Sequence, residues 1–373
     1  TAPFIIETPA DRSHGDFATN AAMAGAKAFR MPPFKIAQAI TSNLDLEGTM
    51  FDRFETAGPG FINFFLGTEF YGRSEYGRDE KVMVEFVSAN PTGPMHMGNA
   101  RGGALGDCLA AVLDKAGYNA WREFYVNDAG NQIEKFGCSL EARYLQIFKG
   151  DEIEFPEDGY QGEDIKDLAK EYADLNGDSL VNVSAEERKK ALVDYALPKN
   201  IKKMQADMEK YKIFYDKWFF ESELHKSGAV KAVVDLLTKK GLTYEKDGAV
   251  WYKNKEVLTQ KLLKEGKSQK YIDNLELKDD VLIRQNGNPT YFTADIAYHK
   301  NKFDRGFTTL IDVWGADHHG HVMRMKGAMD AIGYDGDKLN VVLMQLVKLV
   351  KDGELVKMSK RTGKAIQLGD LLD

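Results

Sequence analysis

The stretch from Val82 to Val126 constrains the fold more than any other part of the sequence. Val82–Val87 is a short apolar run, which is typical of a buried strand. A loop rich in proline and glycine follows, and Ala100–Ala116 then carries apolar residues at helical spacing. Trp121–Val126 has the pattern of a second strand. Because strand, loop, helix and strand follow in this order, the sequence predicts a βαβ unit and an α/β fold with a parallel sheet.

The apolar positions of this helix indicate which face we expect in the core: Leu105, Cys108, Leu109, Val112 and Leu113. Cys108 is then a small core residue. The only other cysteine in the sequence is Cys138. Two cysteines are too few for a disulfide framework, and they fit a reducing cytoplasm.

Residues 1–75 have a mixed character. Helical patterns cover Phe17–Phe29 and Pro33–Leu44, and a strand pattern covers Phe61–Leu66. These residues predict a small α+β domain. The sequence starts at Thr1 rather than at a methionine, and we expect this domain to be trimmed at its start.

The remaining residues predict one domain with an insertion. Residues 76–139 contain the βαβ unit. Residues 140–275 are polar, with helical patterns and no strand–helix alternation, so they predict a mostly helical insertion. Alternation returns in residues 276–373, where Thr309–Trp314 and part of Leu339–Leu349 have strand patterns. Residues 76–139 and 276–373 are therefore expected to be two halves of one domain.

Charge and hydropathy exclude some classes of function. The chain has 50 basic and 57 acidic residues, a net charge of −7. It is therefore not a general nucleic-acid binder held by bulk charge, and we expect no DNA partner, although a local basic face could still hold RNA. It has no apolar run of membrane-spanning length, and its first residues lack a signal-peptide pattern. We expect a cytoplasmic protein, and a monomer.

A first motif, PMHMGN at residues 94–99, lies between the first predicted strand and the start of the helix. Free N–H groups and the helix dipole favour a phosphate there. His96 and Asn99 can donate hydrogen bonds to phosphate oxygens, and Gly98 leaves room for a flat base against its backbone. Taken alone, the motif is also compatible with an ordinary loop histidine.

A second motif, KMSK at residues 357–360, is followed by Arg361 and Gly363. Two lysines on a loop near glycine suit a pyrophosphate leaving group, because they neutralise charge as it develops. Alone, the motif could be a solvated basic loop. Both motifs in this order favour nucleotide chemistry. The chain lacks the GxxxxGK[ST] pattern of P-loop enzymes, and no GxGxxG follows a strand.

The two motifs resemble the two signatures of class I aminoacyl-tRNA synthetases. Longer runs are similar to the arginyl-tRNA synthetases specifically: VEFVSANPTGP at 84–94, YVNDAGNQ at 125–132, YFTAD at 291–295 and GADHHGH at 315–321. GDFATN at 15–20 and AGPGFI at 57–62 resemble that family's N-terminal tRNA-contacting domain. The resemblance covers nearly the whole chain. It implies a Rossmann-like parallel-sheet catalytic domain with a helical insertion and a small α+β N-terminal domain.

The resemblance also implies an arginine–tRNA ligase that uses ATP, with Mg²⁺ on the ATP phosphates, and the partners L-arginine and tRNA(Arg). It implies catalytic roles for His96, Asn99, Lys357 and Lys360. It implies that ATP is bound by Gly93, His96, Gly98, Asn99, Gly315, Asp317, Val356 and Met358. It implies that arginine is bound by Glu85, Ser88, Asn90, Tyr291, Asp295 and His318.

The residue types suit arginine, because a guanidinium is planar, permanently charged and best held by carboxylates. Glu85 lies in a predicted buried strand and Asp295 is expected just after one, so each should be partly desolvated. An unpaired buried carboxylate is costly, which favours a cationic ligand. Asp295 could instead cap the first turn of a helix. Which carboxylate binds which end of the substrate stays open.

Two departures from the family pattern bear on activity. Asn99 stands where the first signature usually has histidine, and asparagine cannot carry a positive charge. We also expect the family's helical anticodon-binding domain to be missing. Because activation in this family generally needs bound tRNA, we expect this chain to be impaired. The histidines of GADHHGH do not all face one point at their spacing, so we expect no metal site there.

Three alternatives stay open. The first is a class I synthetase for another amino acid, which the carboxylates disfavour. The second is a ligase of the same nucleotidyltransferase fold that uses no tRNA, which the N-terminal residues disfavour. The third is a non-catalytic arginine or RNA binder. The KMSK loop disfavours it, but Asn99 leaves it open.

Overall fold

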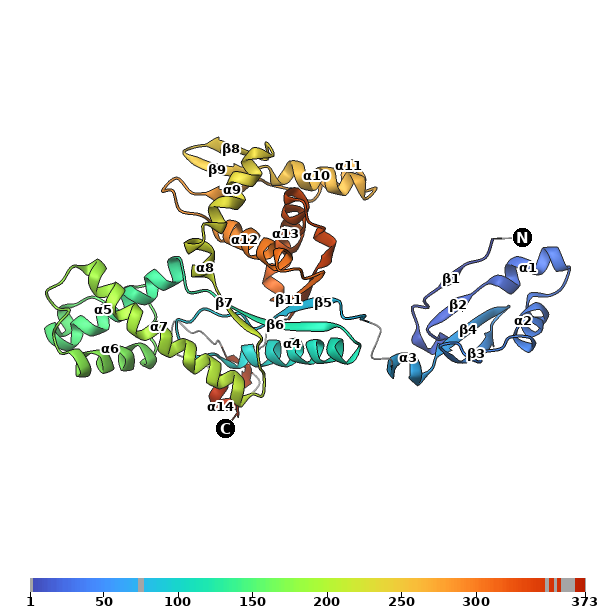
Figure 1. Ribbon diagram of the computed structural model, residues 1–373, viewed down its shortest axis with the longest axis horizontal. Helices are drawn as coiled ribbons and strands as arrows, with labels where there is room; N and C mark the ends of the chain where they lie inside the picture. The colour runs from blue at the N-terminus through green and yellow to red at the C-terminus, as the bar shows by residue number, and fades with distance from the viewer. Residues whose placement is uncertain (1–2, 73–76, 346–348, 352–353, 357–365, 373) are drawn as a thin grey trace. The chain divides into compact units, whose positions relative to one another are not determined.

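The computed structural model describes residues 3–72, 77–345, 349–351, 354–356 and 366–372 (Figure 1). The chain divides into two compact units. One contains residues 1–79 together with 115–118, and the other contains residues 80–114 and 119–373. Among the described residues, no helix combines the length and apolar character that a membrane span requires.

The first unit is built on an antiparallel sheet in the order β1-β2-β4-β3. Its strands are β1 (Ile6–Glu7), β2 (Phe17–Thr19), β3 (Phe51–Ala57) and β4 (Phe61–Leu66), and its helices are α1 (Ala21–Phe29), α2 (Pro33–Ser42) and α3 (Thr68–Gly72). The expected strand at Phe61–Leu66 is confirmed. The helix expected from Phe17 is wrong in its first turn, because residues 17–19 pair with β4 and the helix begins only after Asn20.

The second unit contains the parallel sheet that the sequence predicts. Its order is β12-β11-β5-β6-β7, and each neighbouring pair is parallel. The strands are β5 (Lys81–Glu85), β6 (Asn119–Val126), β7 (Lys217–Phe220), β11 (Thr309–Gly315) and β12 (Leu339–Met344). Successive residues of β5 face opposite cores: Met83 packs with the helices after β7, and Val84 packs on the side of α4 (Met97–Lys115).

Residues 131–210 form a separate helical cluster beside the sheet (Figure 1). It consists of α5 (Asn131–Lys149), α6 (Glu163–Asn176) and α7 (Ala185–Lys210), packed around buried side chains such as Phe136, Tyr144 and Leu192. Ser184 caps α7: its hydroxyl accepts a hydrogen bond from the Glu187 backbone N–H, and the Glu187 carboxylate accepts one from the Ser184 backbone N–H.

Residues 140–275 contain strands as well as helices, so the expectation that they lack strand–helix alternation is wrong. β7 lies within this range and joins the central sheet beside β6. β8 (Thr243–Lys246) and β9 (Ala249–Tyr252) also lie there and pair antiparallel with β10 (Asp280–Ile283). These strands are too short to show a period in the sequence. The domain boundaries themselves stay a prediction.

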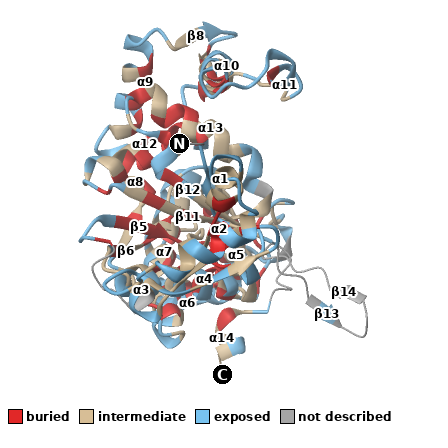
Figure 2. Ribbon diagram, turned by 90° about the vertical axis from the view of Figure 1, so that its right-hand side faces the viewer, coloured by how far each residue is buried: buried red, intermediate tan, exposed pale blue. Residues whose placement is uncertain are grey.

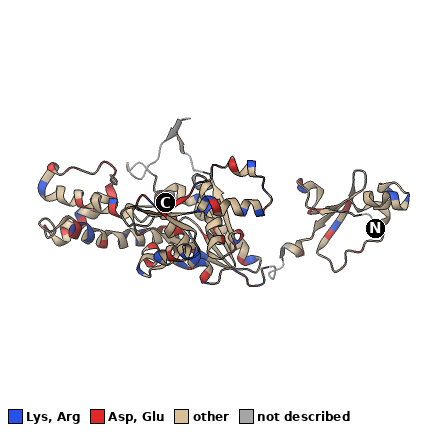
Figure 3. Cartoon of the chain, turned by 90° about the horizontal axis from the view of Figure 1, so that it is seen from above, with Lys and Arg blue, Asp and Glu red and all other residues tan. Residues whose placement is uncertain are grey.

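The other helices of this unit are α8 (Glu221–Lys226), α9 (Ala229–Lys239), α10 (Asn254–Lys264), α11 (Gln269–Asp273), α12 (Tyr291–Asp304), α13 (His319–Ile332) and α14 (Leu368–Leu372). The antiparallel pair β13 (Leu349–Lys351) and β14 (Glu354–Val356) precedes α14. Basic and acidic residues are interspersed along the helices (Figure 3), as in the i,i+4 pair Lys190–Asp194.

The predicted inner face of α4 is wrong at Cys108 and Val112, whereas Leu109 and Leu113 are partly buried against the core as expected. Cys108 is exposed, and Val112 keeps 65% of its surface exposed. The buried face instead carries small residues such as Gly106 and Ala110 (Figure 2 shows the burial along the chain). A Cβ at Gly106 would lie 2.1 Å from Cγ of Phe86, so only glycine lets the helix come this close to the end of β5. The close approach of the helix backbone at Gly106 to the Phe86 side chain therefore accounts for the small residues on the buried face.

Candidate functional site

The first motif forms a self-bonded turn at the start of α4. The His96 backbone N–H donates to Oδ1 of Asn99 at 3.0 Å, and the Asn99 N–H donates to the His96 carbonyl at 2.8 Å. Nδ1 of His96 accepts from the Gly98 N–H at 3.1 Å. A Cβ at Gly98 would lie 2.9 Å from the His96 ring, so this ring occupies the space that we expected a base to use.

The segment after the second motif lies against the first motif. Met97 N–H donates to the Ile366 carbonyl at 3.0 Å, and Leu368 N–H donates to the Met95 carbonyl at 2.8 Å. A cavity of about 190 Å³ opens here between Gly93, His96 and Gln367. The predicted residues Lys357, Met358 and Lys360 lie outside the described residues, and Val356 ends β14.

A second cavity, of about 220 Å³, opens at the carboxyl edge of the central sheet, where parallel α/β sheets bind ligands. It brings together five residues that the sequence analysis singled out: Glu85, Ser88, Asp295, Gly315 and His318. Tyr125, Trp314 and His321 also line it.

A row of three buried carboxylates crosses the sheet beside this cavity. Asp312 on β11 stands opposite Glu85 on β5, and Glu85 stands opposite Glu123 on β6. Asp312 and Glu123 have no exposed surface, and Glu85 keeps 7%. Like charges facing each other in a sheet are unfavourable, so the row requires cations nearby.

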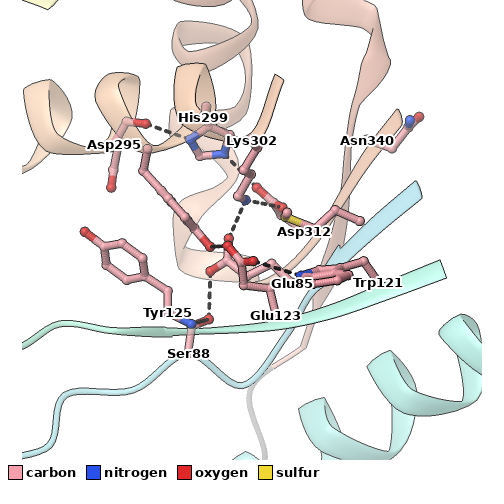
Figure 4. Close-up of polar contacts among 12 residues, drawn as sticks. Glu85, Ser88, Trp121, Glu123, Tyr125, Asp295, His299, Lys302, Asp312 and Asn340 are labelled. Carbon is pink, nitrogen blue, oxygen red and sulfur yellow. Dashed lines mark hydrogen bonds and ion pairs between the residues drawn. The ribbon is translucent and has the colours of Figure 1, made fainter. Parts of the chain in front are cut away.

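Helix α12 and its C-cap residue Arg305 supply those cations, and Figure 4 shows Lys302 and His299 of this helix. Lys302 Nζ lies 2.5 Å from Oε2 of Glu85 and 2.8 Å from Oδ1 of Asp312. Arg305 holds Glu123 through both oxygens, at 2.6 and 2.7 Å. His299 Nε2 lies 2.7 Å from Oδ2 of Asp312, and its Nδ1 lies 2.8 Å from the Asp295 carbonyl.

The row pushes two pKa values apart. Burial raises the pKa of Glu85, and the adjacent Asp312 adds to this rise although Lys302 opposes it. Burial acts on Asp312 in the same direction, but Lys302 and His299 outweigh it and lower its pKa to about 2. Asp312 is therefore the first of the pair to ionise.

The other predicted carboxylate, Asp295, lies inside α12 rather than just after a strand. It is half-buried, and its Oδ2 lies 3.0 Å from Nε2 of His321. We predicted His318 rather than His321 as a site residue. Both line the cavity, but His321 contacts the carboxylate.

The backbone after β5 is strained where it borders the cavity. Val87 has a φ of 70° and Ser88 a φ of 34°, both in the left-handed region that side-chain-bearing residues rarely adopt. The Ser88 hydroxyl donates to Oε1 of Glu85 at 2.7 Å and accepts from the Tyr125 N–H at 3.1 Å. Glu85 is thus held at both of its oxygens.

The sequence analysis missed a third acidic residue, Glu221, which begins α8 directly after β7. It is 4% exposed and lines a neighbouring cavity of about 880 Å³ with Tyr291. The Asn127 amide donates to its Oε2 at 2.8 Å and lies beside Asn90. Burial raises the pKa of Glu221, although hydrogen bonding to His225 and Tyr125 opposes this rise. A buried aromatic run ending in glutamate, KWFFE, was the available signal.

Asp317 lies in the short turn Ala316–His318, and Gly315 ends β11 next to β12. Within the described ranges, no three histidine, cysteine or acidic residues are grouped so that they could hold a metal ion.

Comparisons with known proteins converge on one family. Residues 1–66 match the family model "Arginyl tRNA synthetase N terminal domain", and residues 65–373 match "tRNA synthetases class I (R), catalytic domain". The chain is 54% identical to the arginine–tRNA ligase of Acetivibrio thermocellus and 56% identical to that of Caldanaerobacter subterraneus, over 99% of its own length. It spans 65% of the length of each relative.

Solved structures show the same likeness. A crystal structure from Campylobacter jejuni, assigned to the arginyl tRNA synthetases, has a TM-score of 0.66 and 38% identity, over 79% of this chain and 60% of that one. The arginyl-tRNA synthetase of Thermus thermophilus has a TM-score of 0.60 over 92% of this chain and 62% of that one. Its identity is 21%, so it supports the fold alone.

Proposed function

The chain belongs to the class I arginyl-tRNA synthetase family, and on that premise we propose that it activates L-arginine with ATP and passes the arginyl group to tRNA(Arg). The observation that carries this proposal is the meeting of Glu85 and Asp295 in one cavity at the carboxyl edge of the sheet, with Glu221 beside it. A permanently charged guanidinium is the substrate group that such partly desolvated carboxylates suit.

The two ends of arginine find different partners in this arrangement. Lys302 already lies against Glu85. Asp295 instead has His321 as its neighbour, and Glu221 has the Asn127 amide and His225, so neither contacts a lysine or arginine in these hydrogen bonds. We therefore assign the guanidinium to Asp295 and Glu221, with Tyr291 alongside. Glu85, with Ser88 and Asn90, is assigned to the amino end of arginine, where it accepts a hydrogen bond.

ATP is assigned to the first motif and the end of β11. The dipole of α4 favours its phosphates at the start of the helix, and the side chains of His96 and Asn99 steady them. Gly93 and Gly98 are assigned to the border of the phosphate site, and Gly315 and Asp317 are assigned to the ribose. Mg²⁺ would be bound by the ATP phosphates.

Positioning and charge stabilisation then drive the first step. The arginine carboxylate oxygen attacks the α-phosphorus of ATP in line, the bond to the pyrophosphate oxygen breaks, and arginyl-adenylate forms. Lys357 and Lys360 balance the charge of the departing pyrophosphate, with Val356 and Met358 beside the nucleotide. In the second step the tRNA 3′ hydroxyl takes the arginyl group and AMP leaves. A cytoplasmic monomer remains part of this proposal.

Arginine-dependent ATP–pyrophosphate exchange tests the proposal, with and without tRNA(Arg), and with lysine as the competing substrate. Exchange with arginine but not with lysine supports it. Two controls are assayed in the same way: the full-length Acetivibrio thermocellus relative and the piece of it that matches this chain. They distinguish an effect of chain length from a wrong assignment. If the full relative exchanges and both shorter chains fail, the missing length is responsible.

Direct arginine binding by calorimetry separates the remaining outcomes. Arginine binding without exchange, while the matching piece of the relative is active, would favour the non-catalytic binder and implicate Asn99. Binding of another amino acid in place of arginine would overturn the assignment.

A further inference from the structure

The row of carboxylates poses a physical problem that the proposed function does not address. Asp312, Glu85 and Glu123 face one another across three parallel strands, and all three are buried. Only Glu85 also lines the cavity assigned to arginine. The charge and orientation of Glu85 therefore depend on the side chains that contact it on the side away from the cavity.

Lys302 is the cation behind Glu85. It has no exposed surface, and its ammonium lies between Glu85 and Asp312 while also resting 4.4 Å from the centre of the Tyr298 ring. Burial opposes a charged lysine, but the two carboxylates outweigh it and raise the pKa of Lys302. A buried ammonium kept charged in this way is costly unless each contact is in place.

Lys302 leaves Glu85 a single orientation. One carboxylate oxygen, Oε2, meets Lys302 Nζ, and the other, Oε1, accepts from the Ser88 hydroxyl. The lone pairs that remain free of these contacts are the ones available toward the cavity. Lys302 itself does not line the cavity.

Lys302 also belongs to a chain of contacts that ends on the backbone of Asp295. From its ammonium a chain of contacts runs through Asp312 to His299, and from the His299 ring to the Asp295 carbonyl. Lys302 and Asp295 stand on the same helix, α12. Figure 4 shows these contacts, which begin at the Glu85 carboxylate and end at the Asp295 backbone carbonyl.

We propose that Lys302 is a positioning residue of the arginine site, which holds the Glu85 carboxylate in the orientation that receives arginine. The proposal rests on the proposed function, because it assumes that arginine occupies this cavity. A simpler role would be to offset the buried charge of Asp312, with no consequence for arginine.

The two roles separate in an Asp312→Asn background. In that variant Lys302 has Glu85 alone as its carboxylate partner, so the positioning contact stays. Adding Lys302→Met removes the ammonium and returns the net charge of the pair from +1 to zero, its value in the unmodified chain. Arginine and ATP dissociation constants are measured by calorimetry on the whole chain, with thermal melting to confirm the fold. Lys300→Met is the matched control on the same helix, since Lys300 pairs with Asp304 instead.

We expect Asp312→Asn to keep its arginine affinity within about threefold, and the double variant to lose about 10- to 100-fold while ATP affinity is unchanged. Equal arginine affinity in the single and double variants would overturn the proposal alone. If the unmodified chain binds no arginine, the proposed function fails and the inference fails with it.

Should the double variant not fold, Lys302→Gln replaces Lys302→Met in the same background and is judged by the same criterion. Glutamine keeps a hydrogen-bond donor but no charge. As a second readout, the arginine dissociation constants of the single and double variants are measured from about pH 6 to pH 9. Loss of Lys302 leaves Glu85 beside Glu123, Tyr298 and Ser88, so arginine binding should weaken further toward the lower pH. A flat profile would contradict this role.

Discussion

Asp312 stands directly opposite Glu85 across the parallel pairing of β11 with β5. Two buried carboxylates in this relationship cannot ionise independently. Lys302 and His299 both face Asp312, whereas Glu85 shares only Lys302, which explains why the pKa of Asp312 falls and that of Glu85 rises. Because of this arrangement, we expect the stability of the β5–β11 pair to fall in acid, and the charge of Glu85 in the cavity to depend on Lys302.

The lowered pKa of Asp312 predicts a loss of stability in acid. Its folded-state pKa of about 2 lies below the ordinary 3.8, so its stabilising effect is present above pH 3.8 and is lost as the pH falls toward 2. The expected contribution is about 2 kcal/mol in the free energy of unfolding. Urea unfolding between about pH 5 and pH 2 measures it.

Asp312→Asn should flatten the pH dependence in this window. Asp235→Asn, at an exposed residue that pairs with Lys231, is the control and should keep the full slope. An unchanged slope in Asp312→Asn would show that another group carries the acid sensitivity.

Glu221→Gln should weaken arginine binding by about 10- to 100-fold, because it removes one of the two charges assigned to the guanidinium. Citrulline, in which an uncharged ureido group replaces the guanidinium, should be affected much less. Calorimetry with both ligands measures the difference. Glu223→Gln is the control on the same helix, since Glu223 is exposed and pairs with Lys217. Similar losses for both ligands would argue against charge recognition by Glu221.

His321→Ala should weaken arginine binding about fivefold, because Asp295 loses the hydrogen bond that orients it. His319→Ala, at an exposed neighbour two residues earlier, should have no such effect. The KM for arginine and the KM for ATP in the exchange assay separate the two variants. A rise in the KM for ATP alone would move His321 to the nucleotide side of the site.

Gly106→Ala should destabilise the fold by about 1–3 kcal/mol, because its new Cβ would lie against the Phe86 side chain. Cys108→Ser, on the exposed face of the same helix, should change the free energy of unfolding by less than about 0.5 kcal/mol. Denaturant unfolding of both variants tests which face of α4 is buried. The opposite ranking would restore the face that apolar periodicity predicts.

Much of the site was predictable because it follows strand ends. Glu85 ends a buried apolar run, and parallel strands present their carboxyl ends at one edge of a sheet. That rule, with the family resemblance, led to Glu85, Ser88, Asp295 and His318, which the structure gathers in one cavity. Glu221 was missed because β7 has only four residues and stands after a long helical segment.

Local sequence determined the order of the main strands and helices, because apolar spacing and chain breaks act over a few residues. It also determined which chemical groups are present near phosphate and guanidinium. Only the tertiary structure decided that Lys302 lies between Glu85 and Asp312, residues separated from it by 217 and 10 positions. Strand order and register bring such charges together, and burial then makes their pairing obligatory.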